Sequence, residues 1–332
     1  MRATLKRLGI KTFAHDFAAD KTNAALESAI QHLGFLAASA VERPRALAAC
    51  GHDHIAEFLR PVNVDETDIP EPPPGVPAED VEAVEAVDLE QVQAAFEVAL
   101  AALLVTWSAS VVAGWIDQLV DAVRDAIAAG DFTVLAELAV DTDTAAEMLL
   151  DAMADLAELS AQHVVDEAAE QDVTAEPVVP EREDLEARAT TTAKLEGGRY
   201  AAAAGREASR MADGGLEPDE VADYVRTHLE QMPASGARGA LGGALTGAQN
   251  TSRFATLAAA PEGALYASEK NDSSSCRPCK EIHGRWIANT SDMEIVFKLY
   301  PGSGYINCLG GYRCRGTIVG IWRPQQTKDG AA

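Results

Sequence analysis

The stretch VALAALLVTWSASVVAGWI occupies residues 98–116 and has no charged side chain at any of its nineteen positions. Its larger side chains recur at the spacing of one helical face, and the same spacing continues on both sides of the stretch. The residues of this apolar stripe are Phe96, Leu100, Leu103, Trp107, Val111, Leu119, Val123 and Ile127. The periodicity predicts one long amphipathic helix over residues 89–129, buried along the stripe and ended by Gly130 as its C-cap.

The same stretch is close to the length needed to cross a bilayer, so a membrane-spanning helix is an alternative to a buried helix. Ala, Ser, Thr and Gly dilute its hydrophobicity, and it is flanked by Glu97 and Asp117 with no nearby Lys or Arg that would set an orientation. The apolar stripe also continues beyond the stretch. A buried helix of a bundle explains this pattern better, and we expect no membrane contact.

The composition indicates a mainly α fold. Hydrophobic residues make up 47% of the chain, but only 5% of the residues are aromatic, and alanine dominates the apolar share. Alanine-rich apolar faces suit closely packed helices better than sheets. After Pro261 the character changes, because glycines and strand-like segments such as TIVGIW become frequent. We therefore expect a multi-helix body followed by a small C-terminal α+β module.

The charge of the chain is unevenly distributed. The net charge is −25, yet residues 262–332 hold nine Lys/Arg and seven Asp/Glu, which leaves −27 for residues 1–261. A strongly acidic body argues against non-specific binding to nucleic acid and suits docking on another protein. The C-terminal module is close to neutral, so its net charge differs sharply from that of the acidic body.

A break in the pattern follows the first sixty residues. Residues 61–90 contain six prolines and ten Asp/Glu but no Lys or Arg, which favours an extended chain. The predicted organisation begins with an N-terminal helical segment over 1–60, an acidic Pro-rich linker over 61–88 and a helical hairpin over 89–172. A second linker over 173–184 leads to a helical region over 185–261, with helices near 185–212, 217–232 and 236–258. The chain then continues with a cysteine module over 262–324 and a tail over 325–332.

Four of the five cysteines lie in the last sixty residues. Cys276 and Cys279 form a CxxC, and Cys308 and Cys314 form a wider second pair, with 28 residues between the two pairs. A CxxC places two sulfurs on one tight turn, where both reach a tetrahedral ion at about 2.3 Å. Nearby arginines favour thiolates, and a small module with few large aliphatic side chains needs a cross-link. The spacing predicts a structural zinc site of these four cysteines, with His283 as a lesser candidate ligand.

Other states of these cysteines compete with the zinc site. One or two disulfides, free thiols in a small core and a redox-active CxxC all remain open, although no βαβ pattern precedes the CxxC. The sequence lacks catalytic motifs such as GxSxG and HExxH, so we expect no enzymatic activity and assign no catalytic or cofactor-binding residue. The final strand, 316–322, is expected to pair with 263–269 beneath the cysteine site.

At these residues the chain resembles a known family. ALYASEKNDSSSCRPCKEIHGRWI (264–287) and LYPGSGYINCLGGYRCRGTIVGIW (299–322) are similar to the C-terminal module of phage Mu F-like minor head proteins, the phage head morphogenesis family. The resemblance covers residues 243–324. The matching residues are Asp272, Cys276, Cys279, Gly284, Asn307, Cys308, Arg313 and Cys314. The chain departs from the family where Tyr305-Ile306 replaces the usual His-Pro, and where Leu-Gly-Gly opens the tight Cys-Arg-Cys.

The resemblance implies a minor head protein inside the capsid of a tailed bacteriophage. Such a protein would act in head morphogenesis through the portal protein, with capsid and scaffold proteins as further partners and a role in DNA packaging or ejection. It would reside in the host cytoplasm during assembly and then in the virion. Related sequences imply the alternative of a capsid maturation protease, and the nearness of His283 to Cys279 in the sequence leaves a thiol-dependent hydrolase as a further alternative. Weak contact with DNA through Arg313, Arg315 and Arg323 is a further expectation.

Overall fold

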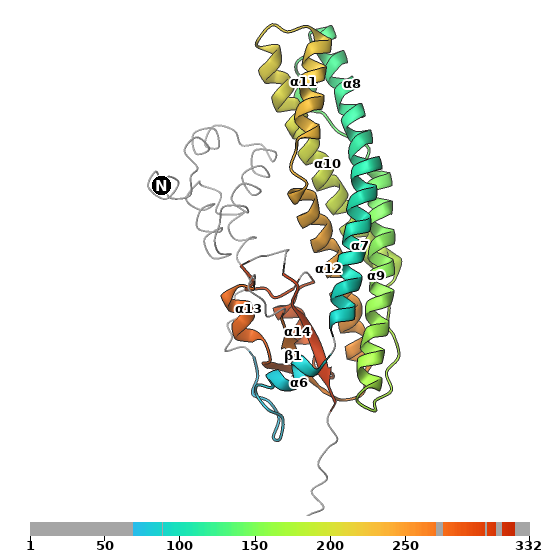
Figure 1. Ribbon diagram of the computed structural model, residues 1–332, viewed down its shortest axis with the longest axis vertical. Coiled ribbons are helices and arrows are strands. Elements are labelled where there is room, and N and C mark those ends of the chain that lie inside the picture. Colours follow the sequence, from blue (N-terminus) through green and yellow to red (C-terminus); the bar gives the residue numbers. More distant parts are fainter. Residues whose placement is uncertain (1–68, 88, 270–274, 303, 310–313, 323–332) are drawn as a thin grey trace, which may run out of the picture.

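The computed structural model describes residues 69–87, 89–269, 275–302, 304–309 and 314–322. An elongated bundle of helices carries a small sheet-containing module at one end (Figure 1). The predicted fold class, a mainly α body with a small C-terminal α+β module beside the cysteines, is confirmed. The predicted helical segment over 1–60 and the tail over 325–332 lie outside the described residues.

The predicted long helix is present. It runs without interruption through α7 (Glu90–Thr106), the π-helical segment η2 (Trp107–Val112) and α8 (Ala113–Ala129), and Gly130 ends it in the left-handed conformation with φ 67°. Seven residues of the apolar stripe are buried: Phe96, Leu100, Leu103, Trp107, Val111, Leu119 and Val123. Ile127 is only partly buried. The sequence periodicity did not reveal the π-helical segment, because its wider turn still leaves Trp107 and Val111 on the buried side.

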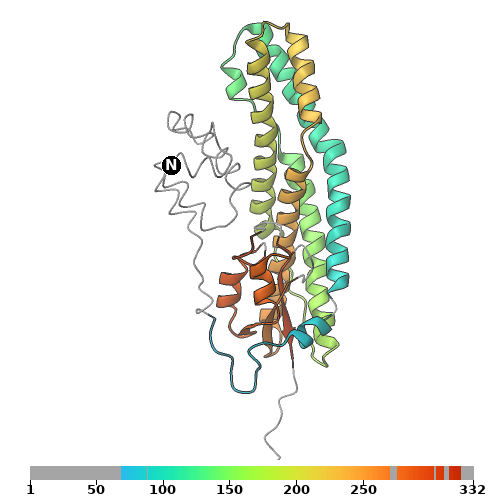
Figure 2. The same ribbon diagram turned by 60° about the vertical axis from the view of Figure 1, so that its left-hand side comes forward.

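Four further helices and a short 3₁₀ turn complete the body. They are η3 (Val134–Ala136), α9 (Asp143–Ala169), α10 (Arg182–Ala212), α11 (Pro218–Glu230) and α12 (Ser235–Ala259). The α7 half of the long helix packs against α9 and α12, whereas the α8 half packs against α11 and α10 (Figures 1 and 2). The helices expected near 185–212, 217–232 and 236–258 are therefore all present, with ends that differ by a few residues.

The segment between α9 and α10 lacks regular structure up to Glu181, as expected for a linker, but it is not free. The Val178 N–H donates to Thr256 Oγ1 at 3.0 Å, and the Val178 carbonyl accepts from Thr256 Oγ1 at 3.3 Å. Ala175 is buried. This strap therefore fastens the start of α10 to the last turns of α12.

The module contains a three-stranded antiparallel sheet in the order β2-β1-β3. Its strands are β1 (Ala264–Ser268), β2 (Trp286–Asn289) and β3 (Thr317–Ile321), accompanied by the short helices α13 (Arg277–Ile282) and α14 (Glu294–Leu299). The register of β1 with β3 places Ala264 opposite Ile321 and Ser268 opposite Thr317. The predicted pairing of 263–269 with 316–322 is therefore confirmed.

The expectation of an extended linker over 61–88 is wrong for residues 81–86, whereas the described residues 69–80 form no helix or extended strand. Helix α6 (Val81–Ala86) is capped by Asp80, whose carboxylate accepts from the Ala83 N–H at 3.0 Å. Val84 is 1% exposed and packs on a sheet face that includes Tyr266 and Trp286. The prolines end at Pro77, and the valines that follow supply an apolar face that outweighs the repulsion between the acidic residues.

The outer edge of β3 is covered by side chains from the body. Outward carbonyls occur at every second residue from Gly316, just before the strand, to Gly320, and each accepts one hydrogen bond. Asn250 of α12 donates to Gly316 at 3.2 Å, Arg253 of α12 to Ile318 at 3.1 Å, and Gln171, just beyond α9, to Gly320 at 3.0 Å. An uncovered strand edge would invite pairing with another chain. Here the same contacts dock the module on the body.

Candidate metal centre

The four cysteines that the sequence singled out lie on three short segments of the module. Cys276 is the N-cap of α13 and Cys279 lies in its first turn, where Pro278 suits the start of a helix. Cys308 ends the turn that follows α14, and Cys314 precedes β3. Cys279 and Cys314 are buried, whereas Cys276 and Cys308 are partly exposed.

The structure brings the four sulfurs into one chain of contacts. Cys276 Sγ lies 3.4 Å from Cys279 Sγ and 3.8 Å from Cys308 Sγ, and Cys279 Sγ lies 3.9 Å from Cys314 Sγ. Metal–sulfur bonds of about 2.3 Å in a tetrahedron separate neighbouring sulfurs by about 3.8 Å. The sulfurs of Cys276, Cys279 and Cys308 therefore lie close enough to share one ion, whereas Cys314 contacts Cys279 and groups with Glu269 rather than with all three other cysteines.

A buried carboxylate, Glu269, joins the cysteines, and the sequence did not single it out. Its Oε1 accepts from the Tyr300 hydroxyl at 2.9 Å, and its Oε2 lies 3.7 Å from Cys314 Sγ. Two groups of potential ligand atoms result, Cys276–Cys279–Cys308 and Glu269–Cys279–Cys314, and within each group all atoms lie within 4.8 Å of one another. The only sequence signal for Glu269 is an acidic residue directly after an apolar strand.

His283, the lesser candidate ligand, is placed in another role. Its Nδ1 accepts a hydrogen bond from the backbone N–H of Glu269 at 3.1 Å, and its Nε2 lies 3.8 Å from a carboxylate oxygen of Glu85. Among the described residues, His283 belongs to neither group of potential ligand atoms. It therefore positions the strand end that carries Glu269.

In the absence of an ion, burial and the mutual contacts within the cluster favour the protonated, neutral forms of its side chains. Burial, the largest effect, raises the pKa of Glu269 to about 7, although the Tyr300 hydroxyl opposes this shift. Hydrogen bonding to Cys308 and Cys314, together with burial, raises the pKa of Cys279. In Cys314, hydrogen bonding from Cys279 lowers the pKa, but Cys308, burial and Glu269 outweigh that effect and raise it. A metal cation would reverse these preferences and hold the thiols as thiolates.

The expectation that nearby arginines favour thiolates is wrong for the arginines that the structure describes there. Arg277 donates to Glu281 at 2.6 Å. Arg315 pairs with Glu97 of α7 and stacks over the Phe96 ring, with its guanidinium carbon 4.7 Å from the ring centroid. Both side chains are therefore paired with carboxylates rather than with the sulfurs.

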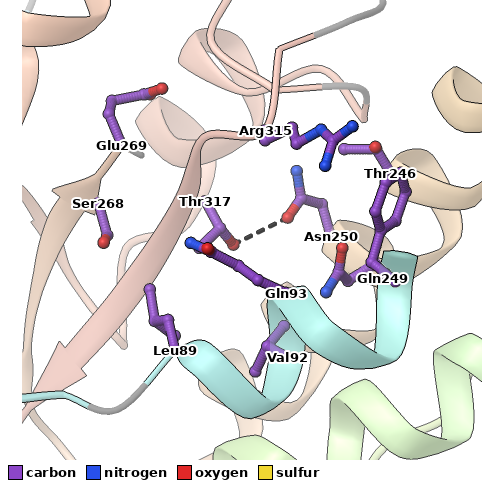
Figure 3. Close-up of a pocket in the computed structure, with 11 residues that line it drawn as sticks. Leu89, Val92, Gln93, Thr246, Gln249, Asn250, Ser268, Glu269, Arg315 and Thr317 are labelled. Atoms are coloured by element: carbon purple, nitrogen blue, oxygen red, sulfur yellow. Dashed lines mark hydrogen bonds between the residues drawn. The ribbon is translucent and has the colours of Figure 1, made fainter. Parts of the chain in front are cut away.

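Arg315 also borders a small cavity where the module meets the body. Gln93 of α7 and Gln249 and Asn250 of α12 face Thr317 of β3 in this cavity (Figure 3). Thr317 Oγ1 donates to Asn250 Oδ1 at 2.8 Å. The cavity volume is about 30 Å³, which is the space of one water molecule. It lies at the joint between the module and the body.

The chain matches no protein-family model, no curated protein and no solved structure. The site is therefore defined by its own geometry. It is a cluster of cysteines and one glutamate that could hold a metal ion, built on loops and docked against a helical body.

Proposed function

We propose that this chain is a minor head protein of a tailed bacteriophage, acting inside the capsid in head morphogenesis through the portal protein. One observation carries the proposal. The cysteines that resemble the phage Mu F-like pattern, although spread over 39 residues from Cys276 to Cys314, come together in one site. The module that holds them is fastened to the end of an acidic helical bundle, whose surface suits protein partners such as the portal, capsid and scaffold proteins.

The ion proposed for the site is structural zinc, held by Cys276, Cys279, Cys308 and Cys314. Zinc takes four thiolates in tetrahedral geometry, and the close contacts among Cys276, Cys279 and Cys308 support it; Cys314, which contacts Cys279, would have to move closer to complete the site. Glu269 lies against Cys314 and would act from outside the four sulfurs. When bound, the ion would supply the cross-link that fixes α13 and the 305–308 turn to β3.

The geometry supports a structural role better than thiol-dependent hydrolysis. A hydrolase needs a base beside its nucleophilic thiol. The His283 Nδ1 instead accepts the Glu269 N–H. A role in DNA packaging or ejection is proposed to act through the portal, because Arg315 is engaged with Glu97. Arg313 and Arg323 lie outside the described residues.

Co-assembly tests the head-protein proposal. The chain is expressed with the portal and capsid proteins of the same genome, and washed procapsids and virions are examined by mass spectrometry. We expect the chain at low copy number, retained only in particles that contain the portal. Its absence from both kinds of particle would overturn the proposal.

Metal analysis tests the zinc assignment separately. We expect about one zinc per purified chain, lost when Cys276 and Cys308 are both replaced by serine. Cys50→Ser is the matched control, because this cysteine lies far from the module in sequence, and it should keep the metal. Metal-free protein with an ordered module would argue against a zinc cross-link.

A further inference from the structure

The four cysteines divide into two groups of ligand atoms that overlap at Cys279. Cys314 Sγ lies 3.9 Å from Cys279 Sγ, but it forms no group of close ligand atoms with Cys276 or Cys308. It groups instead with Cys279 and Glu269, and all three of these residues are buried. One ion bound to all four sulfurs would therefore require Cys314 to move closer, whereas two ions that share the Cys279 sulfur would not.

The second group, Glu269–Cys279–Cys314, has the spacing that an ion of its own requires. Metal–sulfur bonds of about 2.3 Å and metal–oxygen bonds of about 2.1 Å in a tetrahedron separate an oxygen from a neighbouring sulfur by about 3.6 Å. Glu269 Oε2 lies 3.7 Å from Cys314 Sγ, and Cys314 Sγ lies 3.9 Å from Cys279 Sγ. The three side chains can therefore hold an ion in the positions that they already occupy.

Glu269 is a buried carboxylate that lacks a counter-ion. It is 6% exposed, and among the described residues no Lys, Arg or His side chain pairs with it. Its Oε1 accepts from the Tyr300 hydroxyl at 2.9 Å, whereas its Oε2 faces the sulfur of Cys314. Buried carboxylates are as a rule paired with a cation or bound to a metal. The carboxylate is therefore placed as a ligand on the side of the cluster away from Cys276 and Cys308.

The backbone is shaped around Glu269 and Cys314. Cys314 Sγ accepts hydrogen bonds from the Tyr305 N–H at 3.3 Å and from the Gly316 N–H at 3.4 Å. Hydrogen bonds of this kind favour the thiolate, which is the form that binds a metal. A Cβ at Gly304, where φ is +105°, would lie 2.7 Å from the same sulfur, and a Cβ at Gly316 would collide with the Glu269 carboxylate. Glycine at these two positions leaves room for both ligands.

From this geometry we infer that the cluster binds a second divalent cation, zinc or another thiolate-seeking ion, through Glu269, Cys279 and Cys314, with the Cys279 sulfur bridging it to the first ion. The inference rests on the proposed zinc site, which supplies that first ion. When the first ion is bound alone, all four cysteines hold it. When the second ion binds, Cys314 stays with Glu269, and each ion has three protein ligands. The second ion is therefore held less tightly and is taken up from added metal.

A single-ion cluster is the alternative, and charge separates the two cases. Four thiolates and one carboxylate carry a charge of −5, so one divalent ion leaves −3 and a second ion leaves −1. A large net charge is costly in a buried site. With a single ion, Glu269 would therefore keep its proton and donate it to the Cys314 sulfur. Glutamine can make the same donation but is a far poorer metal ligand, so Glu269→Gln distinguishes the two arrangements.

The test counts the ions bound by the full purified chain. The chain is loaded with excess cadmium, which like zinc binds thiolates, and loosely held ions are removed by gel filtration in citrate. We expect about two cadmium ions per wild-type chain and about one per Glu269→Gln chain. Glu281→Gln is the matched control, because it removes the same charge from the same module while its carboxylate faces Arg277. This control should keep both ions.

Cadmium NMR then locates the second ion. We expect two resonances in the wild-type protein, each split by coupling through the Cys279 sulfur, and one unsplit resonance in Glu269→Gln. Two uncoupled resonances would place the second ion elsewhere on the acidic chain and overturn the inference. One ion in the wild type, or two in Glu269→Gln, would also overturn it but leave the zinc site standing. A wild-type chain that binds no ion would overturn both.

Discussion

Arg253 and Glu167 form a two-bonded ion pair in the interior, with Arg253 Nη1 2.7 Å from Glu167 Oε1 and Nη2 2.9 Å from Oε2. The two side chains are 0% and 5% exposed. Arg253 Nη2 also donates to the Ile318 carbonyl of β3. One buried guanidinium therefore joins α12, α9 and the sheet, and the module cannot shift on the body without leaving a charge unpaired.

Removing one partner of this pair should be strongly destabilising. Glu167→Gln leaves the Arg253 charge buried without its counter-ion, which costs about 3–5 kcal/mol. Urea denaturation measures the change in the free energy of unfolding. Asp151→Asn, which breaks the exposed pair with Arg182, is the control and should change stability by less than about 1 kcal/mol. Similar losses of unfolding free energy in both variants would show that the buried pair contributes no more to stability than the exposed pair.

Trp107→Asp tests the buried stripe of the long helix. The change places an unpaired carboxylate where the side chain is 0% exposed, so we expect a loss of roughly 4 kcal/mol or more. Val105→Asp, at a 70% exposed position on the same helix, should stay within about 0.5 kcal/mol of wild type. Thermal unfolding compares the two. A Trp107→Asp protein that unfolds at the wild-type temperature would contradict this packing.

Cys279→Ser tests the cross-link in the module. Cys279 contacts both Cys276 and Cys314 and belongs to both groups of potential ligand atoms, so its loss should affect the entire site. We expect hydrogen exchange to accelerate over residues 262–324, while the helices of the body remain protected. A chelator should reproduce this effect in the wild-type protein. An ordered module in the variant after chelator treatment would mean that the cysteines are not a cross-link.

Glu269 should make the metal-free protein pH-dependent. Its folded pKa of about 7 lies above the ordinary value of 4.5, so the folded state binds the proton more tightly than the unfolded state. Its contribution is therefore fully present below about pH 4.5 and is lost as the pH rises through 7, by roughly 3 kcal/mol. Urea denaturation of chelator-treated protein between pH 4.5 and 8 measures this slope. Glu269→Gln should flatten it, and a slope that persists in the variant would contradict the assignment.

The sequence predicted the elements whose signals are local. The stripe from Phe96 to Val123 repeats at the helical period, and Gly130 marks the end of the helix, so the long helix could be placed to within a residue. The prediction failed for residues 81–86, where acidic residues and nearby prolines suggested a linker. Helix α6 forms because Val84 packs against a face of the sheet. The sheet lies far away in the sequence, so the local composition gives no sign of this contact.

The candidate site shows the same division. The CxxC spacing predicts two neighbouring sulfurs, since both lie on one turn, and the count of cysteines indicates a second pair. Glu269 and the different role of His283 could not be predicted, because they depend on how the end of β1 meets the end of α13 and on a hydrogen bond from Tyr300. The residue types were visible in the sequence, but their orientation was not.

By itself, then, the sequence determined the long helix, the acidic body, the late change to a strand-containing module and the clustering of cysteines. These depend on periodicity, composition and short spacings, which act between near neighbours in the chain. The tertiary structure alone decided that α6 covers the sheet, that Glu269 joins the sulfurs and that Arg253 meets Glu167 across 86 residues. Burial and desolvation decide such contacts, because they act only once distant segments have been brought together.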